Sequence, residues 1–310
     1  MGKRVLVYGS FVVDLTSRSN SLPVPGQTVL GNSFKLGPGG KGSNQAVAAH
    51  RAGADVTFVT KLGDDVFART ALDFYEKEGI DTSHILIGKD METGAALILV
   101  DEENGQNQIV VVIGACGKIT PEDIEQARPL IKGADYLLLQ LEINFDALFQ
   151  IIHIAHQAGV QIILNPAPAA VIPEEIFSMI HIITPNETEA QALTGVVVNN
   201  ETDARRAAEI LLQKGVQNVV ITMGALGAYA TDGIRSERLP RIPVEAVDTT
   251  GAGDAFNGGL VMALAEGMDL FTALRYGNVT GALSVTELGT APAMPRRKQI
   301  DMLYQKTYSS

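Results

Sequence analysis

The sequence lacks the features that would tie it to a membrane, to a nucleic acid or to an oxidising compartment. Its apolar runs fall short of the ~18 residues that a membrane span needs. The apolar run after Arg4 stops at Gly9, which is typical of a first strand and not of a signal peptide. The formal net charge is −11, so no broad basic face is expected for a phosphodiester backbone or an anionic bilayer. A single cysteine, Cys116, excludes an internal disulfide framework and fits a reducing compartment. We therefore expect a cytoplasmic protein without a nucleic-acid or membrane partner.

What the sequence does contain is a regular alternation of two kinds of segment. Hydrophobic residues make up 46% of the 310 residues, which is enough for one large α/β domain over 1–310. Short β-branched apolar runs alternate with segments whose apolar residues return at helical spacing. The expected strands are 5–8, 56–59, 136–139, 162–164, 182–184 and 219–222, and the expected helices are 45–51, 67–78, 146–157, 203–213 and 254–265. The pattern predicts an α/β fold with a doubly wound, mostly parallel sheet and helices on both faces.

Two segments interrupt this alternation. They are 28–36, and the pair 95–100 and 108–113 joined by a polar turn. Their pattern predicts antiparallel strands without helices of their own. We expect a small projecting β-sheet, a lid, formed by inserted segments about 12–37 and 93–114. An isolated sheet of this size is marginal in water, so we expect substrate or a second copy to cover it and predict a homodimer through the lid.

A glycine-rich segment at residues 37–42 (GPGGKG) precedes one expected helix and formally matches GxGxxG. In a dinucleotide-binding fold that motif closes the turn directly after the first strand, whereas here roughly thirty residues separate the two. A P-loop is excluded as well, because Gly42 follows Lys41 where that motif needs Ser or Thr. On its own the segment is either a functional loop or a tight turn before a helix starting at Ser43.

A second cluster, residues 247–256 (VDTTGAGDAF), places small residues and an acid at the start of an apolar helix. Backbone N–H groups from Gly251 to Asp254 would be unpaired there and would favour an anion such as phosphate. Phosphoryl transfer to a hydroxyl needs a proton acceptor, donors for the developing charge and a bridging metal. The cluster supplies the first two, with Asp254 as the base; the alternative is that Asp254 only caps the helix.

The third cluster, residues 184–189 (TPNETE), follows an expected strand. Asn186 and Glu189 lie three residues apart on one helical face and are candidates to hold Mg²⁺ through water beside a triphosphate. The alternative is an N-cap asparagine with Glu189 as the acid of its capping box.

Together and in order, these motifs resemble those of the ribokinase-type sugar kinases, also called the PfkB carbohydrate kinases. Residues 39–44 (GGKGSN) resemble the first signature of that family, 248–256 its second, and 186–189 its NxxE motif. Residues 141–142 (LE), 165–168 (NPAP) and 222–227 (TMGALG) are also similar to ribokinases. The resemblance runs from Gly9 to the region of Gly289. It implies a ribokinase-like fold and an ATP-dependent kinase, a transferase that phosphorylates the 5-hydroxyl of a pentose, either ribose or 2-deoxyribose.

The resemblance also implies roles for individual residues. Asp254 would be the base, and Gly251, Ala252 and Gly253 the anion hole. The sugar would be bound by Val12, Asp14, Gly40, Lys41, Gly42, Ser43, Asn44, Glu142 and Asp254. ATP would be bound by Asn186, Thr222, Gly224, Gly227, Gly253 and Asn278. Mg²⁺ would be held through water by Asn186 and Glu189, and an activating K⁺ by Asp248, Thr250, Ser284, Glu287 and Gly289.

Two positions depart from the family pattern. Where ribokinases typically have an asparagine that faces the sugar O2, this chain has Val12, which cannot hydrogen-bond to a hydroxyl. We therefore expect 2-deoxyribose to be used at least as well as ribose. Ala293 falls where ribokinases often have serine, at the edge of the K⁺ site.

Two other functions remain open from the sequence: a kinase for a nucleoside or hexose, and a non-catalytic sugar-binding regulator. A nucleoside kinase would need an apolar shelf for the base in the lid. Asp14, Lys41, Asn44 and Glu142 instead form a compact polar set suited to a free sugar. A regulator would show a damaged base or anion hole, and both are intact.

Overall fold

Eight strands form the central sheet of the computed structural model, which describes residues 2–308. Their order is β14-β13-β12-β11-β10-β9-β1-β4, and the six from β12 to β4 run parallel. The strands are β1 (Arg4–Tyr8), β4 (Asp55–Val59), β9 (Tyr136–Leu139), β10 (Gln161–Leu164), β11 (Ile182–Ile183), β12 (Asn218–Thr222), β13 (Ala228–Thr231) and β14 (Ser236–Leu239). The parallel strands are the six predicted from the sequence, so the predicted fold class is confirmed. The antiparallel edge of β13 and β14 was not predicted.

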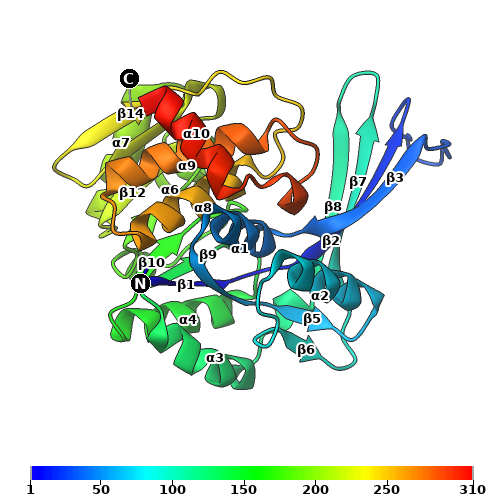
Figure 1. Cartoon of the computed structure of the whole chain (residues 1–310), viewed down its shortest axis with the longest axis horizontal. Helices are drawn as coiled ribbons and strands as arrows, with labels where there is room; N and C mark the ends of the chain where they lie inside the picture. The colour runs from blue at the N-terminus through cyan, green and yellow to red at the C-terminus, as the bar shows by residue number, and fades with distance from the viewer. Residues whose placement is uncertain (1, 309–310) are drawn as a thin grey trace.

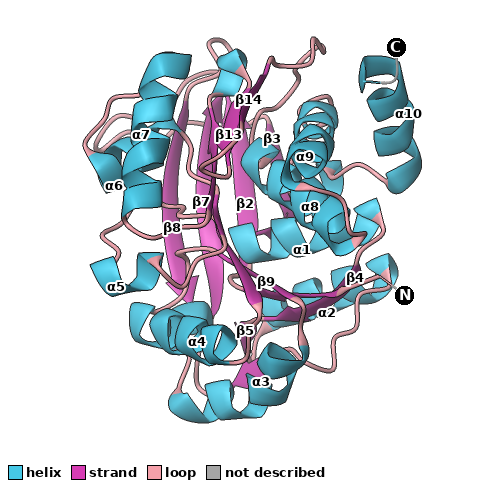
Figure 2. Cartoon of the chain, turned by 90° about the vertical axis from the view of Figure 1, so that its left-hand side faces the viewer, coloured by secondary structure: helices cyan, strands magenta, loops and turns pink. Residues whose placement is uncertain are grey.

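Helices cover both faces of this sheet, as Figure 2 shows. One layer contains α1 (Lys41–Ala52), α8 (Ala252–Ala265), α9 (Leu270–Ser284) and α10 (Arg297–Tyr308). The other contains α3 (Pro121–Gly133), α4 (Phe145–Gln157), α5 (Glu174–Phe177), α6 (Glu187–Thr194) and α7 (Glu201–Gln213). The remaining helix, α2 (Val66–Glu78), contributes Tyr75 to the first layer. The five predicted helices correspond to α1, α2, α4, α7 and α8; the others were not predicted.

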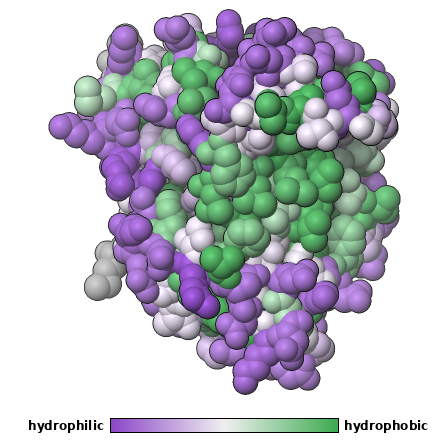
Figure 3. All heavy atoms as spheres, turned by 90° about the vertical axis from the view of Figure 1, so that its right-hand side faces the viewer, coloured by the Kyte–Doolittle hydropathy of each residue, from purple (hydrophilic) through white to green (hydrophobic). Residues whose placement is uncertain are grey.

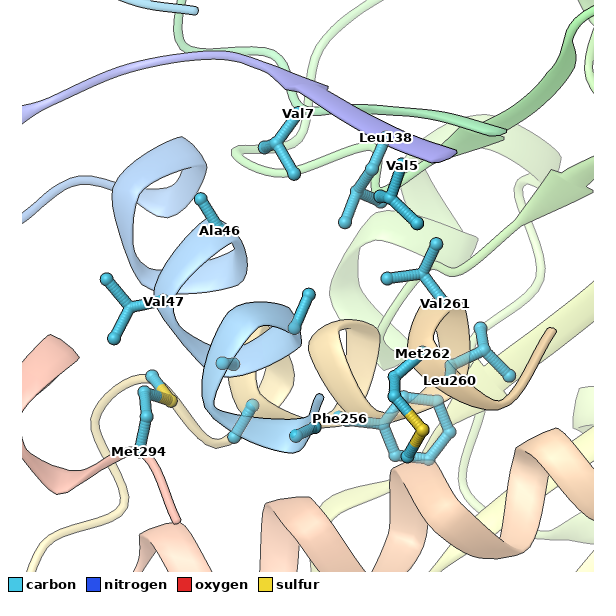
Figure 4. Packing of buried hydrophobic residues seen from close by; sticks show 14 of the residues in the cluster. Val5, Val7, Ala46, Val47, Leu138, Phe256, Leu260, Val261, Met262 and Met294 are labelled. Carbon is cyan, nitrogen blue, oxygen red and sulfur yellow. The ribbon is translucent and has the colours of Figure 1, made fainter. Parts of the chain in front are cut away.

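Alternate residues of each strand pack against opposite helix layers. In β1, Val5 and Val7 join the cluster of α1 and α8, whereas Leu6 and Tyr8 join the cluster of α3 and α4. Figure 4 shows Val7 pointing toward α1 and Val5 toward α8. Every residue of α8 from 254 to 265 is buried. The first turn of α8 is therefore held firmly at one end of the sheet.

A separate four-stranded sheet projects from the main body on the right of Figure 1. Its strands are β2 (Val12–Ser19), β3 (Ser33–Gly39), β7 (Thr93–Asp101) and β8 (Asn107–Gly114), in the order β3-β2-β7-β8. The pairs β2–β3 and β7–β8 are antiparallel, whereas β2 and β7 are parallel. The predicted small sheet is thus confirmed, and we call it the lid.

Two details of the lid differ from the prediction. The predicted strand 28–36 begins only at Ser33, and 28–32 forms no strand. The strand β2 lies within the predicted lid segment 12–37 but was not predicted as a strand, because the charged residues Asp14 and Arg18 break its apolar pattern. A second small pair, β5 (Lys61–Gly63) and β6 (Leu86–Gly88), runs parallel below the lid. Between residues 2 and 308, no helix combines the length and apolarity that crossing a bilayer requires.

Candidate active site

The predicted sugar-binding residues gather where β1 and β9 end. The first strand has β4 on one side and β9 on the other, so the order of strands along the chain reverses at this point. In open α/β sheets, ligands bind in the crevice outside the carboxyl ends of the strands at such a reversal. Ser10 follows β1, and Gln140 and Glu142 follow β9.

The glycine loop brings the N-terminus of α1 to the same place. Gly40 has φ +87°, and a Cβ atom there would lie 2.8 Å from the backbone nitrogen of Val12. A Cβ atom on Gly42 would lie 2.5 Å from the nitrogen of Ser10. The loop therefore packs directly against the end of β1, and α1 begins at Lys41 rather than at 43 or 45.

Glu142 joins the two sides of the predicted sugar site. Its Oε2 accepts hydrogen bonds from Ser10 Oγ at 2.5 Å and from the backbone nitrogen of Lys41 at 2.9 Å. The Lys41 side chain lies near Asp254, whose negative charge raises the pKa of the Lys41 ammonium, as does that of Glu142. Lys41 is therefore a cation at neutral pH.

Asp254 lies buried in the first turn of α8. Its Oδ2 accepts from Asn44 Nδ2 at 2.9 Å, and its Oδ1 accepts from Gln45 Nε2 at 2.9 Å. Burial raises the pKa of Asp254, while Lys41 and the two amide donors act in the opposite direction. The sequence did not single out Gln45, because a helical pattern alone does not show which buried amide will reach a distant carboxylate.

The turn before Asp254 leaves backbone donors open at Gly251 and Gly253, whereas Ala252 N donates to Thr249 O at 3.3 Å. Gly251 is the N-cap of α8 with φ +78°, and no side chain of residues 2–308 caps this turn. Gly253 is exposed, and nothing lies within 4 Å of a Cβ atom built on it. A negatively charged group can therefore approach these N–H groups beside Asp254. The capping role considered for Asp254 does not apply, since its carboxylate binds Asn44 and Gln45.

A cavity of about 510 Å³ opens beside this turn, a size typical of small-molecule sites. Six of its lining residues are those that the resemblance assigns to ATP: Asn186, Thr222, Gly224, Gly227, Gly253 and Asn278. Asn278 Nδ2 donates to Pro240 O at 3.0 Å and to Tyr308 Oη at 2.9 Å, which fixes one end of the cavity. The apolar wall was not predicted, because its residues come from separate loops and helices and do not form one pattern in the sequence. It includes Ile242, Val244, Ala246, Phe256, Ala282 and Val285.

The lid supplies Asp14 and Val12. The two lie two residues apart on β2, so their side chains point to the same face of the lid. Burial raises the pKa of Asp14 to about 6, and the charges of Glu142 and Asp254 add to this effect. The lid face that carries Asp14 is therefore directed toward Glu142 and Asp254.

Ser43 departs from the predicted arrangement. The resemblance places it among the sugar contacts, but the structure buries its side chain completely. Its Oγ accepts a hydrogen bond from Tyr75 Oη at 2.7 Å in the core. Because successive helical residues point in different directions, Ser43 faces away from Asp254 while Asn44 faces it.

The candidate Mg²⁺ residues form the capping box that the sequence left open as an alternative. Asn186 Oδ1 accepts from Glu189 N at 2.8 Å, and Glu189 Oε2 accepts from Asn186 N at 2.8 Å. Glu189 Oε1 also accepts from Asn186 Nδ2 at 3.0 Å. Burial raises the pKa of Glu189. Within 2–308, no three or more His, Cys, Asp or Glu side chains cluster as metal ligands would.

The candidate K⁺ residues are only partly together. Asp248 accepts from Thr250 N at 3.0 Å and from Gly289 N at 3.1 Å, which draws the two loops together. Ser284 Oγ instead donates to Gly281 O within its own helix at 2.9 Å. The Glu287 side chain is exposed.

The site thus combines a buried carboxylate beside an open helix N-terminus, a group of polar side chains on one side and a cavity of about 510 Å³ on the other. This arrangement is typical of a phosphotransferase that acts on a hydroxyl. Residues 3–297 match the pfkB family of carbohydrate kinases. The chain is 40% identical over 299 residues to a ribokinase of Haemophilus influenzae, covering 96% of this chain and 97% of that protein. It is 36% identical over 298 residues to a deoxyribokinase of Salmonella typhi, with coverage of 96% and 97%.

A solved structure of Arabidopsis thaliana ribokinase, complexed with ribose and ATP, has the same fold. The two superpose with a TM-score of 0.92 at 30% identity, over 98% of this chain and 99% of that chain. The chain belongs to the pfkB carbohydrate kinase family.

Proposed function

We propose that this protein is an ATP-dependent kinase that phosphorylates the 5-hydroxyl of ribose or 2-deoxyribose in the cytoplasm. The observation that carries this proposal is the position of Asp254. It lies between the polar residues Lys41, Asn44 and Glu142 and the exposed backbone of Gly253 at the cavity.

In this reaction Asp254 takes the proton of the sugar 5-hydroxyl as the oxygen attacks the γ-phosphorus of ATP. The new O–P bond forms as the bond between the γ-phosphorus and the bridging oxygen breaks, and ADP leaves. The backbone N–H groups of Gly251, Ala252 and Gly253 stabilise the charge that develops on the phosphoryl oxygens. Such a base contributes typically ~10²–10⁴-fold to the rate.

The sugar site favours a free sugar over a nucleoside. Asn44 Oδ1 is buried, and nothing in 2–308 hydrogen-bonds to it, so a sugar hydroxyl can donate to it without competition. Glu142 and Asp14 add carboxylate acceptors, and Lys41 adds a donor. The intact base and helix N-terminus argue against a non-catalytic regulator.

The candidate Mg²⁺ and K⁺ residues differ in how they could hold a cation. Asn186 and Glu189 already bind each other, so they fit Mg²⁺ through water rather than as direct ligands. Bound there, Mg²⁺ would neutralise charge on the phosphates of ATP. For K⁺, Asp248 with Thr250 and Gly289 offers carboxylate and carbonyl oxygens beside the anion hole. Ser284 and Glu287, the other two candidates, would have to turn toward this loop to bind the ion.

We also propose that two copies pair through the lid. The strand register places five exposed apolar side chains on the lid face opposite Asp14, which we call the outer lid face. Figure 3 shows hydrophobic residues gathered on the side of the molecule that carries the lid. β8 is also an edge strand with an unpaired outer side. The outer lid face consists of Phe34, Leu36, Leu97, Val110 and Val112, which are 44% to 64% exposed.

One assay tests the proposed function: sugar-dependent release of ADP from ATP, with ribose, 2-deoxyribose, other pentoses, hexoses and nucleosides as acceptors. We expect the highest kcat/KM with one of the first two, and a product phosphorylated at the 5-position. A higher kcat/KM with a nucleoside or hexose would favour those kinases instead. Sugar binding without ADP release would point to a regulator.

A further inference from the structure

A chain of buried amide side chains leads from the end of β9 to the base. Gln140 Nε2 donates to Gln45 Oε1 at 2.6 Å, and Gln45 Nε2 donates to Asp254 Oδ1 at 2.9 Å. The second hydrogen of the same Gln45 nitrogen goes to Asn165 Oδ1 at 3.0 Å. The exposed fraction of Gln45 is 0% and that of Gln140 is 1%. Both amides are therefore shielded from water. Gln45 is fully paired with protein atoms, whereas Oε1 of Gln140 has no hydrogen-bond partner in residues 2–308.

These contacts leave Gln45 a single orientation. An amide has two N–H donors and one carbonyl acceptor, and each of the three has a partner here. If the amide turned over, its oxygen would face the carboxylate of Asp254 and its nitrogen would face the donor nitrogen of Gln140. Asp254, Asn165 and Gln140 thus all favour the one orientation in which the nitrogen of Gln45 meets Asp254.

The two oxygens of Asp254 face different surroundings. Oδ2 accepts from Asn44, which belongs to the proposed sugar site. Oδ1 accepts from Gln45, whose other partners Gln140 and Asn165 lie in the interior. A carboxylate held at Oδ1 from the interior side presents Oδ2 to the acceptor hydroxyl.

The charges around Asp254 explain why its ionised form benefits from the amide donor of Gln45. Lys41 is the cation that faces it, from the start of α1. Three carboxylates act on it from other elements and oppose its ionisation: Asp14 of β2, Glu142 after β9 and Glu189 of α6. An amide donor stabilises the ionised base without adding a charge that would bind the transferred phosphate.

We propose that Gln45 is a positioning residue for phosphoryl transfer: oriented by Gln140, it holds Oδ1 of Asp254 so that Oδ2 stays aimed at the sugar hydroxyl and free of a proton. This inference rests on the proposed function, in which Asp254 is the base. Gln45 itself touches neither substrate in this arrangement, so its effect reaches the reaction through Asp254.

The substitution Gln45→Met tests the proposal, because methionine has nearly the size of glutamine but no N–H group. Loss of a charge-assisted hydrogen bond corresponds to a roughly tenfold to hundredfold fall in kcat. The acid limb of the kcat–pH profile should move up by about one unit, since the ionised base loses a donor. The KM for the sugar should stay within about threefold, because the sugar contacts remain.

Gln140→Met gives a second test that leaves both groups of the Gln45–Asp254 contact in place. It should shift the acid limb in the same direction by a smaller amount, because Gln45 loses the partner that orients it. Thr60→Val is the matched control: Thr60 is fully buried and its hydroxyl contacts Cys116 Sγ at 3.5 Å, outside the site. That variant should keep the wild-type acid limb whatever its thermal stability.

A Gln45→Met enzyme with wild-type kcat and an unmoved acid limb overturns the proposal. If Gln45→Met does not fold, the Gln140→Met variant provides the test. An acid limb that stays at the wild-type pH in folded Gln140→Met overturns the proposal as well. Asp254→Asn, measured alongside, distinguishes failure of the proposed function from failure of the role of Gln45. Activity in Asp254→Asn contradicts the base assignment, whereas an inactive Asp254→Asn beside an unaltered Gln45→Met contradicts only the role of Gln45.

Discussion

Thr290 donates its hydroxyl hydrogen toward Asp14 Oδ2, 3.0 Å away, and so joins the loop after α9 to the lid. The same hydroxyl lies 3.0 Å from the carbonyl oxygen of Pro38, on the neighbouring lid strand. The preceding residue, Gly289, binds Asp248 through its backbone. Two adjacent residues thus connect the lid to the loop that leads into the N-terminus of α8.

The Thr290–Asp14 contact predicts how sugar use depends on pH. Burial raises the pKa of Asp14 to about 6, so the carboxylate is protonated below that pH and loses acceptor capacity for sugar hydroxyls. We expect kcat/KM for the sugar to fall as the pH drops through about 6. Thr290→Val removes a bond that favours the ionised form, so the fall should begin up to about one unit higher. Superimposable kcat/KM profiles for the two enzymes would contradict this.

The raised pKa of Asp14 also affects the free energy of unfolding. Because the pKa of Asp14 is higher in the folded than in the unfolded chain, the unfolded state binds fewer protons between about pH 4 and pH 6. The contribution of Asp14 to the free energy of unfolding therefore decreases as the pH rises through this window. Thermal unfolding of wild type and Asp14→Asn across the window measures that contribution directly.

Asp254→Asn should reduce kcat by ~10²–10⁴-fold while the fold and sugar binding persist. Asparagine keeps the size and polarity of the side chain but cannot take the proton. Calorimetric binding of the sugar and circular dichroism serve as controls for the fold. A variant that retains more than about a tenth of wild-type kcat is incompatible with a base of this strength.

The local patterns in the sequence predicted the six parallel strands. Buried strands such as β9 read as uninterrupted apolar runs, and Asp254 stands in a motif whose glycines mark a functional turn. The lid strand β2 was missed because one face carries Asp14 and Arg18, so the alternation expected of a strand is disturbed.

The site residues that were missed share a different cause. Gln45 and Thr290 meet their partners over 209 and 276 positions of sequence, and neither lies in a pattern that marks such a contact. Ser43 was wrongly predicted to contact the sugar because it lies in a motif. The motif did not show that its hydroxyl points to Tyr75. Side-chain direction on α1 depends on where the helix begins, which the packing of Gly40 and Gly42 determines.

The outer lid face predicts a homodimer at micromolar concentration. Val110→Glu places a charge on that face at the edge strand β8 and should yield monomers, measured by sedimentation or scattering. Val171→Glu is the matched control, because Val171 is 89% exposed in a loop outside the lid. A wild-type monomer contradicts the prediction, as does equal dissociation of the two variants.

K⁺ should activate the enzyme more than Na⁺. A cation held beside Asp248 would order the loop into Gly251 and offset the carboxylate charge near the anion hole. Asp248→Asn should lower the response to K⁺ while ATP-independent sugar binding is retained. Equal rates in K⁺ and Na⁺, each titrated to saturation, would contradict an activating K⁺ site at Asp248.

Val12 predicts which pentose is preferred. It lies on the same lid face as Asp14, is 4% exposed, and has Gly39 and Gly94 as its strand partners. Since neither partner has a side chain, the strand positions directly beside Val12 supply no side-chain group to hydrogen-bond a sugar hydroxyl there. A hydroxyl buried against Val12 without a partner costs ~1–3 kcal/mol.

We therefore expect 2-deoxyribose to be used at least as well as ribose, with ribose still a substrate. A site that hydrogen-bonds a hydroxyl can reject the analogue lacking it by ~10⁴–10⁵, whereas an apolar pocket rejects an added hydroxyl by only ~10². Val12→Asn should accordingly move the preference toward ribose, measured as kcat/KM for both sugars. Val12→Leu serves as the control, since it changes shape without adding a hydrogen-bonding group. A wild-type preference for ribose above tenfold, unchanged in Val12→Asn, would show that another group binds O2.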